Sequence, residues 1–221
     1  MLRFTIKLII SLSIFISTFT FAERRIDNQT CGIERGKQLT AGNFGPYDYT
    51  NPQHQHFRPT VEDYHFTREV ELLKAAIGGA TPGSDIQYTL RKFPNHHRAL
   101  YSMVRYQTEQ HKWLPLDFSK LYSMNCFFER AHYFKPNDPM VYMLQAIYYY
   151  KIKQLSRSEQ FYLKSLSIFP DNAEANYNIA LLYIELNNLE AAKKYAQAAY
   201  KLGHPLQGLK NKLAKLNITV E

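Results

Sequence analysis

The sequence predicts an all-α fold: a right-handed solenoid of antiparallel helix hairpins with an irregular N-terminal arm. Two observations predict it. A pattern that begins at Pro139 begins again at Ala173, a spacing of 34 residues, and both copies carry small side chains at the same positions. A fixed period of this length is typical of helix hairpins that stack on one another.

The small residues explain how the two helices of each hairpin can pack. Two antiparallel helices approach closely only where side chains are short, and larger neighbours fill the remaining space. Pro170 and Pro205 then end the second helix of each hairpin, because proline lacks an N–H and clashes with the preceding turn. The small residues recur as the pairs Ala146 and Ala180, Ser158 and Ala192, and Ser165 and Ala199.

This pattern resembles the tetratricopeptide repeat family, whose period and small positions it matches. It departs from the family where a Trp is common, since Tyr142 and Asn176 stand there, and where Gln145 replaces a usual Leu. The resemblance implies a solenoid whose first helices line a concave groove for a peptide or a protein. It also implies a scaffold rather than an enzyme, so we expect no catalytic residues and no cofactor.

Further blocks resemble those of a family of exported bacterial repeat proteins of unknown function. That resemblance covers residues 31–104 and implies no mechanism. The blocks that carry it are Gly45-Pro46-Tyr47-Asp48-Tyr49, His65-Phe66-Thr67 and residues 85–100.

Motifs upstream extend the repeats towards the N-terminus. Phe93-Pro94-Asn95 echoes residues 169–171, so a copy is expected over 97–138, longer than the period. The extra length is placed at 111–117, because Pro115 cannot continue a helix. A degenerate copy is expected over 63–96, with helices at 67–77 and 85–92 and Ser84 as an N-cap. The repeats therefore divide into copies at 63–96, 97–138, 139–172 and 173–205.

The last segment, 206–221, is expected to be a capping helix. Leucines recur at helical spacing over 206–217, with lysines on the other face, and a stack of hairpins needs a polar outer cap for solubility. A basic helix lying on a membrane surface is the alternative. The leucines are Leu206, Leu209, Leu213 and Leu216, and the lysines are Lys210, Lys212 and Lys215.

Residues 1–22 are typical of a signal peptide. Arg3 and Lys7 precede an apolar run over 8–21, and Ala22 ends a small-residue cleavage site. An uncleaved membrane anchor is the alternative, although the run is shorter than the ~20 residues of a spanning helix. We expect an exported, periplasmic protein. The net charge of the full chain is +8, or +6 without Arg3 and Lys7 of the signal, and it is spread through the repeats. This does not indicate a nucleic-acid partner, although an anionic surface remains compatible with it.

The two cysteines, Cys31 and Cys126, both follow the expected signal. An oxidising compartment would preserve a disulfide between them, which would tie the N-terminal segment to the repeats. The sequence leaves open whether they are bridged or are two free buried thiols, because it does not show that their Cα atoms come close.

The expected arm, 23–62, contains Gly and Pro that break regular structure, yet it also holds Phe44, Tyr47 and Phe57. Because a free linker would have fewer aromatic residues, we expect an arm that packs on the helices, within the concave face.

Histidine is the one residue type here that could carry metal chemistry. A metal-binding or enzymatic module is therefore an alternative, although the spacing is a weak signal. Its residues would be His54, His56, His65, His96 and His97.

The resemblance to tetratricopeptide repeats implies which side chains face a partner. The surface is rich in apolar and tyrosine side chains, with Met143 and Ile147 at positions where some relatives carry a clamp for a C-terminal carboxylate. The arm could fill this groove itself. Otherwise, an unidentified envelope protein would offer a peptide or helix, and peripheral membrane association and oligomeric state stay open. The groove residues are Arg98, Tyr101, Arg105, Met140, Met143, Ile147, Tyr150, Lys151, Glu174, Tyr177, Leu181, Ile184 and Glu185.

Overall fold

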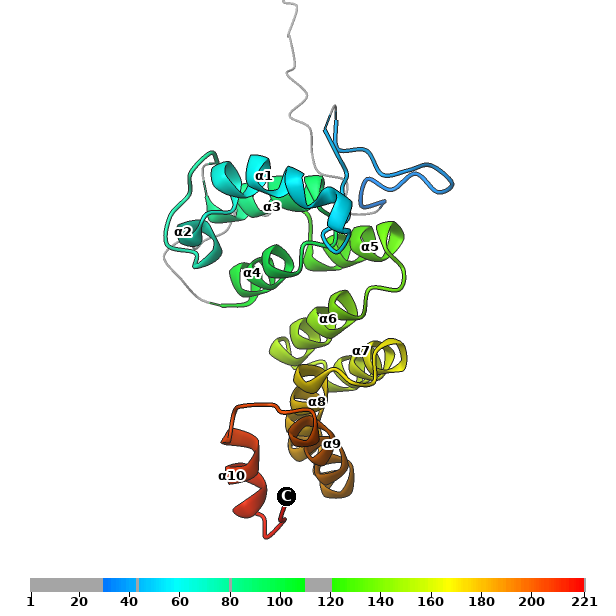
Figure 1. The fold of residues 1–221 in the computed structure, drawn as a ribbon, viewed down its shortest axis with the longest axis vertical. Helices are drawn as coiled ribbons and strands as arrows, with labels where there is room; N and C mark the ends of the chain where they lie inside the picture. Colours follow the sequence, from blue (N-terminus) through cyan, green and yellow to red (C-terminus); the bar gives the residue numbers. More distant parts are fainter. Residues whose placement is uncertain (1–29, 43, 80, 110–120, 221) are drawn as a thin grey trace, which may run out of the picture.

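The computed structural model describes residues 30–42, 44–79, 81–109 and 121–220, and this part of the chain is all helical (Figure 1). The signal peptide expected over 1–22 and the insertion expected at 111–117 lie outside the described residues. No helix among those described is long and apolar enough to cross a membrane. The helices are η1 (Pro52–Phe57), α1 (Arg58–His65), α2 (Arg68–Glu71), α3 (Pro82–Lys92), α4 (His97–Thr108), α5 (Met124–Phe134), α6 (Pro139–Lys151), α7 (Leu155–Ile168), α8 (Ala173–Glu185), α9 (Leu189–Lys201) and α10 (Gly208–Ala214).

The C-terminal half consists of two regular hairpins, α6 with α7 and α8 with α9 (Figure 1). Ala146, Ser158, Ala180 and Ala192 are fully buried where the paired helices meet. Short side chains at these positions allow the close approach that the repeat pattern predicts. The two hairpins therefore form successive layers of a solenoid, as expected from the sequence.

The turns of the two hairpins also repeat. Lys153 and Asn187 both adopt left-handed backbone conformations, with φ of 60° and 56°. In each turn the following residue donates its amide to a carbonyl of the preceding helix: Gln154 to Tyr149 and Asn188 to Tyr183, each at 2.9 Å. This arrangement satisfies carbonyls that a helix end leaves unpaired. Both hairpins therefore close with the same backbone geometry.

The helices of the N-terminal half pair differently. Helix α4 packs mainly against α3 and α6, and it meets α5 less extensively. The contact between α4 and α5 includes Gln107, whose side chain accepts from the amide of Met124 at 3.1 Å and donates to the carbonyl of Tyr122 at 3.0 Å. The copy at 97–138 is therefore a more open hairpin than the two that follow it.

The expected degenerate copy at 63–96 is wrong in its first helix. Residues 67–77 contain only the short helix α2 and then a loop, while α1 packs on α3. The loop wraps the buried carboxylate of Asp85, which accepts from the amides of Ile77 at 2.9 Å and Gly78 at 3.1 Å. These backbone groups bond to a side chain instead of continuing a helix. Helix α3 also begins earlier than expected, and Thr81 rather than Ser84 caps it.

The N-terminal arm is less irregular than expected. Residues 52–62 are helical, in η1 and the start of α1, and Asn51 caps η1 by accepting from the amide of Gln53. Pro52 and Pro59 lie in the first turns of these helices, where a missing N–H costs nothing. We had expected these prolines to break regular structure; here they begin it. The irregular part of the described arm is therefore 30–51.

The last helix, α10, packs against α8 and α9, with Leu209 and Leu213 fully buried. It spans Gly208–Ala214 and is thus shorter than the expected 206–217. Leu206 and Leu216 lie outside it, with exposed fractions of 58% and 42%. Only two of the four leucines therefore belong to the buried face of the cap.

Candidate functional site

The candidate site is a groove on the inner side of the solenoid, with a cavity of about 400 Å³. Helices α4, α6 and α8 provide most of its lining, and α7 provides one residue. First helices of successive hairpins contribute to one surface because the hairpins stack in register. The lining residues are Tyr101, Met143, Leu144, Ile147, Tyr150, Lys151, Tyr162, Glu174, Asn178 and Leu181.

The floor of the groove is apolar and well packed. Met143, Leu144 and Tyr162 are buried there. Ile147, Tyr150 and Leu181 are half-buried and pack against the hydrophobic core. Aromatic and Met side chains offer a large contact area and can adapt to different partners. This surface is therefore suited to apolar side chains of a peptide.

The exposed wall is formed by Tyr101, whose exposed fraction is 43%. Exposure of a large aromatic side chain beside an apolar cavity is a common property of binding surfaces. Tyr101 lies on α4, one layer away from the residues of α8. A segment that touched both Tyr101 and Leu181 would therefore cross three successive first helices.

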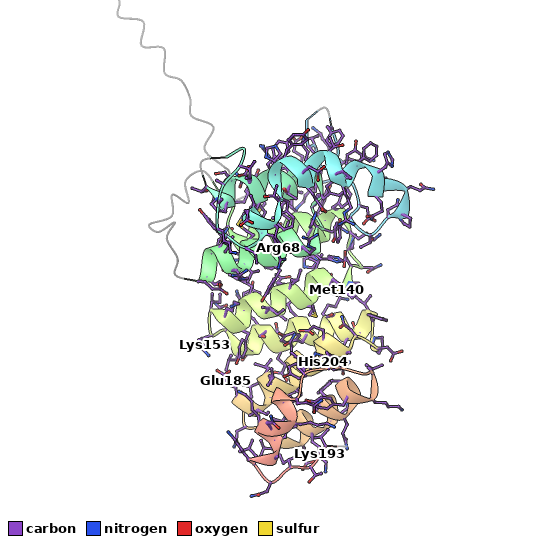
Figure 2. The ribbon with its side chains drawn as sticks, turned by 60° about the vertical axis from the view of Figure 1, so that its left-hand side comes forward. Arg68, Met140, Lys153, Glu185, Lys193 and His204 are labelled. Atoms are coloured by element: carbon purple, nitrogen blue, oxygen red, sulfur yellow. A yellow bond between two sulfur atoms is a disulfide. The ribbon has the colours of Figure 1, made fainter. Side chains whose placement is uncertain are left out.

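Charged side chains border the groove as ion pairs. Lys151 Nζ lies 2.9 Å from Glu109 Oε1, and Glu174 Oε2 lies 3.1 Å from His204 Nε2. At the outer edge Lys153 pairs with Glu185 at 2.9 Å, and Figure 2 shows these two side chains near one another. The groove thus combines an apolar floor with a rim that carries both charges.

Tyr150 links the floor to this rim. Burial and a hydrogen bond with Glu185 raise the pKa of its phenol to about 12. The hydroxyl therefore stays protonated at neutral pH and can donate. Burial also raises the pKa of Tyr162 in the floor. Neither phenol supplies an ionised base at neutral pH, and both contribute to the groove as aromatic surface.

The structure brings seven of the thirteen expected groove residues to the cavity. They are Tyr101, Met143, Ile147, Tyr150, Lys151, Glu174 and Leu181. The expectation missed Leu144, Tyr162 and Asn178. Tyr162 comes from a second helix, and the other two stand one helical position from residues that were named. Two features of the sequence could have indicated missed residues: the hydrophobic pattern of α6 for Leu144, and the tyrosine in α7 for Tyr162.

The other six expected residues lie elsewhere, and most have intramolecular partners. Arg98 donates to Glu71, with distances of 2.9 and 2.7 Å, and Arg105 donates to Glu109 at 3.3 Å. Met140 and Ile184 pack against the core, and Glu185 pairs with Lys153. These side chains stabilise the fold around the groove.

Tyr177, the sixth of them, is buried, with an exposed fraction of 7%. Its ring stacks on His204 with 3.9 Å between centroids. Its hydroxyl lies 3.2 Å from the point where a Cβ on Gly208 would stand, so the start of α10 covers this position. Tyr177 was expected to line the groove, but it is covered instead, because the cap packs on it.

The described arm does not lie in the groove, contrary to expectation. It packs on the end of α3 and on α5: the Tyr47 amide donates to the Lys92 carbonyl at 2.7 Å, and the Tyr133 hydroxyl donates to the Lys37 carbonyl at 2.6 Å. None of the described residues before 63 lines the cavity. Buried backbone groups need hydrogen-bond partners, and α3 and α5 supply them. The groove is open with respect to this part of the chain.

A disulfide joins the arm to α5. Cys31 and Cys126 are bridged, with 5.0 Å between their Cα atoms and a sequence separation of 95. Buried Arg130 donates to the carbonyl of Cys31 at 3.0 Å and lies over the ring of Tyr122. Of the two possibilities that the sequence left open, the structure shows the bridge.

The five histidines of the metal alternative are not brought together. His65 bonds to Asp85 at 3.0 Å, His96 to Glu62 at 2.9 Å, and His97 to Asp138 at 2.9 Å. His54 accepts from the amide of Asp48, and His56 contacts Phe57. Within the described ranges no three His, Cys, Asp or Glu side chains are grouped as metal ligands. Each of these histidines has a separate local contact.

The fold and the groove can be compared with known proteins. A family model described as tetratricopeptide repeat matches residues 161–194, from within α7 to within α9. The chain is also similar to the human protein "Protein O-mannosyl-transferase TMTC3", with 24% identity over 172 residues. That alignment covers 76% of this chain and 17% of the human protein. The chain thus spans a small part of the length of this relative.

Proposed function

This chain is a tetratricopeptide-repeat protein, and we propose that it is a scaffold whose groove binds an amphipathic helix or an extended peptide of a partner protein. Tetratricopeptide repeats generally mediate protein–protein interaction. The observation that carries the proposal is the apolar cavity across α4, α6 and α8, which the chain's own described arm leaves open.

The chemistry of the groove supports an amphipathic partner. Ile147, Tyr150 and Leu181 would contact the apolar side chains of a bound helix, and the ion pairs at Lys151 and Glu174 would face its polar sides. A helix that lies in a groove presents apolar residues at i, i+3 or i+4, and i+7. We propose that the partner carries this spacing.

We propose a binding role rather than a catalytic one. The human relative is named as a transferase, but the alignment covers 17% of it, and a tetratricopeptide-repeat model matches residues 161–194 of this chain. The groove is lined mainly by apolar side chains, and the carboxylate of Glu174 in its lining already has a hydrogen-bond partner in His204. This lining favours binding of a partner protein over catalysis.

We further propose that the protein is exported and acts in the periplasm on an envelope protein. The apolar run over 8–21 supports export, and the disulfide between Cys31 and Cys126 is compatible with an oxidising compartment. N-terminal sequencing of the protein recovered from the envelope tests this proposal. A mature chain that begins at Glu23 supports it, and a cytoplasmic chain with an intact N-terminus contradicts it.

The binding proposal is tested by affinity capture from the envelope fraction with a matched pair of variants. Tyr101→Ser removes an exposed tyrosine from the groove, and Tyr64→Ser removes an even more exposed tyrosine, at 66%, from α1. Neither change is expected to alter the fold, because both side chains are exposed. A partner that the wild type and Tyr64→Ser retain, but Tyr101→Ser loses, supports the groove; equal capture by both variants contradicts it.

A further inference from the structure

The C-terminal end of the solenoid is strongly basic. Residues 189–221 contain six lysines and two acidic residues, Glu190 and Glu221. In the described part of the chain none of these lysines lies within ion-pair distance of a carboxylate, although Lys212 is near enough to Glu185 to help lower the pKa of that carboxyl. This contrasts with Lys135, Lys151 and Lys153, each of which has an acidic partner. The six are Lys193, Lys194, Lys201, Lys210, Lys212 and Lys215.

Three of the lysines share the outer face of α9. Lys193, Lys194 and Lys201 are exposed, as is Gln197 between them, and their spacing places them on the side of the helix opposite the buried alanines. Figure 2 shows Lys193 at the C-terminal end of the molecule, far from Arg68 of α2. The charge is therefore concentrated at one end of the solenoid and is not spread through the repeats as expected.

Exposed leucines accompany this charge. The loop between α9 and α10 exposes Leu202 and Leu206, with fractions of 38% and 58%, and Leu216 follows α10. Leu206 and Leu216 were expected to be part of the buried cap, whereas Leu202 precedes the segment expected to form it. Leucines in contact with water cost free energy unless another surface covers them.

The loop is held in position beside the lysines. The hydroxyl of Tyr200 donates to the Leu206 carbonyl at 2.9 Å and accepts from the Lys210 amide at 3.0 Å. The Lys210 ammonium lies 4.6 Å from the centroid of the Tyr200 ring. Tyr200 thus fixes the exposed Leu206 next to a cation.

We propose that this end of the protein, residues 193–216, docks on an anionic lipid surface, with Leu202 and Leu206 inserted between the headgroups. Leucines flanked by unpaired lysines match such a surface in both respects: the acyl region takes the leucines and the headgroups attract the lysines. A soluble anion would engage the lysines and leave the leucines exposed. Docking here is independent of the groove, which α4, α6 and α8 line.

The loop of the preceding hairpin provides a matched control. The segment between α7 and α8 exposes Phe169, with a fraction of 47%, but the charged residue beside it is Asp171. An exposed apolar side chain is therefore present in both loops, and only the later loop is surrounded by lysines. If lipid contact is detected at Leu206 and not at Phe169, it is specific to the C-terminal end and not a general property of exposed apolar side chains.

The test uses a dye whose emission shifts to the blue in an apolar environment. The full chain carries it at Leu206→Cys or, as the control, at Phe169→Cys, with the native disulfide intact. Vesicles of phosphatidylcholine with phosphatidylglycerol are expected to shift the emission at 206 and not at 169. Vesicles of phosphatidylcholine alone are expected to shift neither, and high salt is expected to reverse the shift at 206.

Removal of the charge tests the lysines separately. In the Leu206→Cys background, the combined change Lys193→Gln, Lys194→Gln and Lys201→Gln is expected to weaken lipid binding roughly 100-fold, because each lysine near an anionic bilayer strengthens binding about fivefold. A control with the same change in net charge, Arg35→Gln, Arg91→Gln and Lys164→Gln, is expected to retain binding.

Three results would overturn the proposal. The first is the absence of a shift at 206, or an equal shift at both positions. The second is equal weakening by the two triple changes. The third is an equal shift at 206 with soluble polyphosphate, which would mean that the lysines recognise anions in general rather than a lipid surface.

Discussion

The two halves of the molecule are stabilised in different ways. In the C-terminal half, Ala180, Ala192 and Ala196 are fully buried, and the hairpins repeat the same packing. In the N-terminal half, the buried residues include Asp85 and His96, which bond to His65 and Glu62, 20 and 34 residues away in the sequence. Close packing of small residues recurs with the sequence period, whereas specific polar pairs occur once each. The N-terminal half therefore depends on a few individual contacts, and the C-terminal half depends on many similar ones.

Removal of the disulfide should produce the largest difference between the halves. Cys31→Ser with Cys126→Ser opens a long loop, with a sequence separation of 95, and is expected to cost up to about 5 kcal/mol of stability. Hydrogen exchange should show lost protection in α3 and α5 and retained protection in α8 and α9. Equal loss in α5 and α9 would contradict the division into two halves.

Tyr177→Ala tests the C-terminal half at its cap. The ring is buried and stacks on His204, so its removal is expected to cost about 3 kcal/mol. The matched change Tyr101→Ala, at an exposed position, is expected to alter stability by less than about 0.5 kcal/mol. Thermal and urea unfolding of the two variants measures both values. A Tyr177→Ala protein as stable as Tyr101→Ala would mean that α10 does not depend on this contact.

The N-terminal half should also be the more sensitive to mild acid, because of His96. Burial lowers the pKa of this imidazole, despite its hydrogen bond to Glu62. Its Nδ1 accepts from the Ala99 amide at 3.2 Å, which requires the unprotonated nitrogen. The unfolded chain then binds a proton more readily, so stability is present above pH 6.5 and is lost as the pH falls below it.

This dependence is measured by unfolding at pH 7.5 and at pH 5.5, followed in α3 and α4 by hydrogen exchange. His96→Gln removes the titrating group and is expected to reduce the decline without abolishing it, because burial also lowers the pKa of His132. An identical decline in the wild type and the variant would exclude His96 as the cause.

Glu62 responds in a different pH range. Burial would raise the pKa of its carboxyl, but hydrogen bonds from His96 and Arg58 outweigh this effect and lower the pKa to about 2. Its contribution is therefore present above pH 4.5 and is lost as the pH falls towards 2. Because His96 and Glu62 affect stability in different pH ranges, one series of unfolding measurements against pH distinguishes their contributions.

The smallest effect is expected inside the repeats. The Ser158 hydroxyl donates to the Ala146 carbonyl at 2.9 Å, and Ala192 occupies the equivalent position of the next copy. Ser158→Ala should cost about 1 kcal/mol or less, because it removes one hydrogen bond and leaves the close packing unchanged. Urea unfolding measures this value. A loss of several kcal/mol would show that the repeats also depend on individual polar contacts.

The repeated half could be predicted from the sequence because its information is local and periodic. The pairs Ala146 with Ala180 and Ser158 with Ala192 were sufficient to identify the hairpins, and all four are fully buried. The N-terminal half could not be predicted in the same way. The amides of Ile77 and Gly78 bond to Asp85 in a loop where a helix was expected. The local sequence pattern does not predict these hydrogen bonds.

The groove was predictable in part for the same reason. Its central residues, Met143 and Ile147, follow from the repeat register. Tyr177 has the equivalent position to Met143 in the next copy, but α10 covers it because no further hairpin follows α9 among the described residues. The register gives the inner face of a repeat, and the neighbouring elements decide whether that face is accessible.

We propose that the open groove across α4, α6 and α8 is the site that binds a partner. The most direct test is selection of helical peptides from a random library against the full chain, followed by measurement of Kd. We expect peptides with apolar residues at i, i+3 or i+4, and i+7, whose affinity falls at least about tenfold with Tyr101→Ser and is unchanged with Tyr64→Ser. Selected peptides that bind both variants equally well would contradict it.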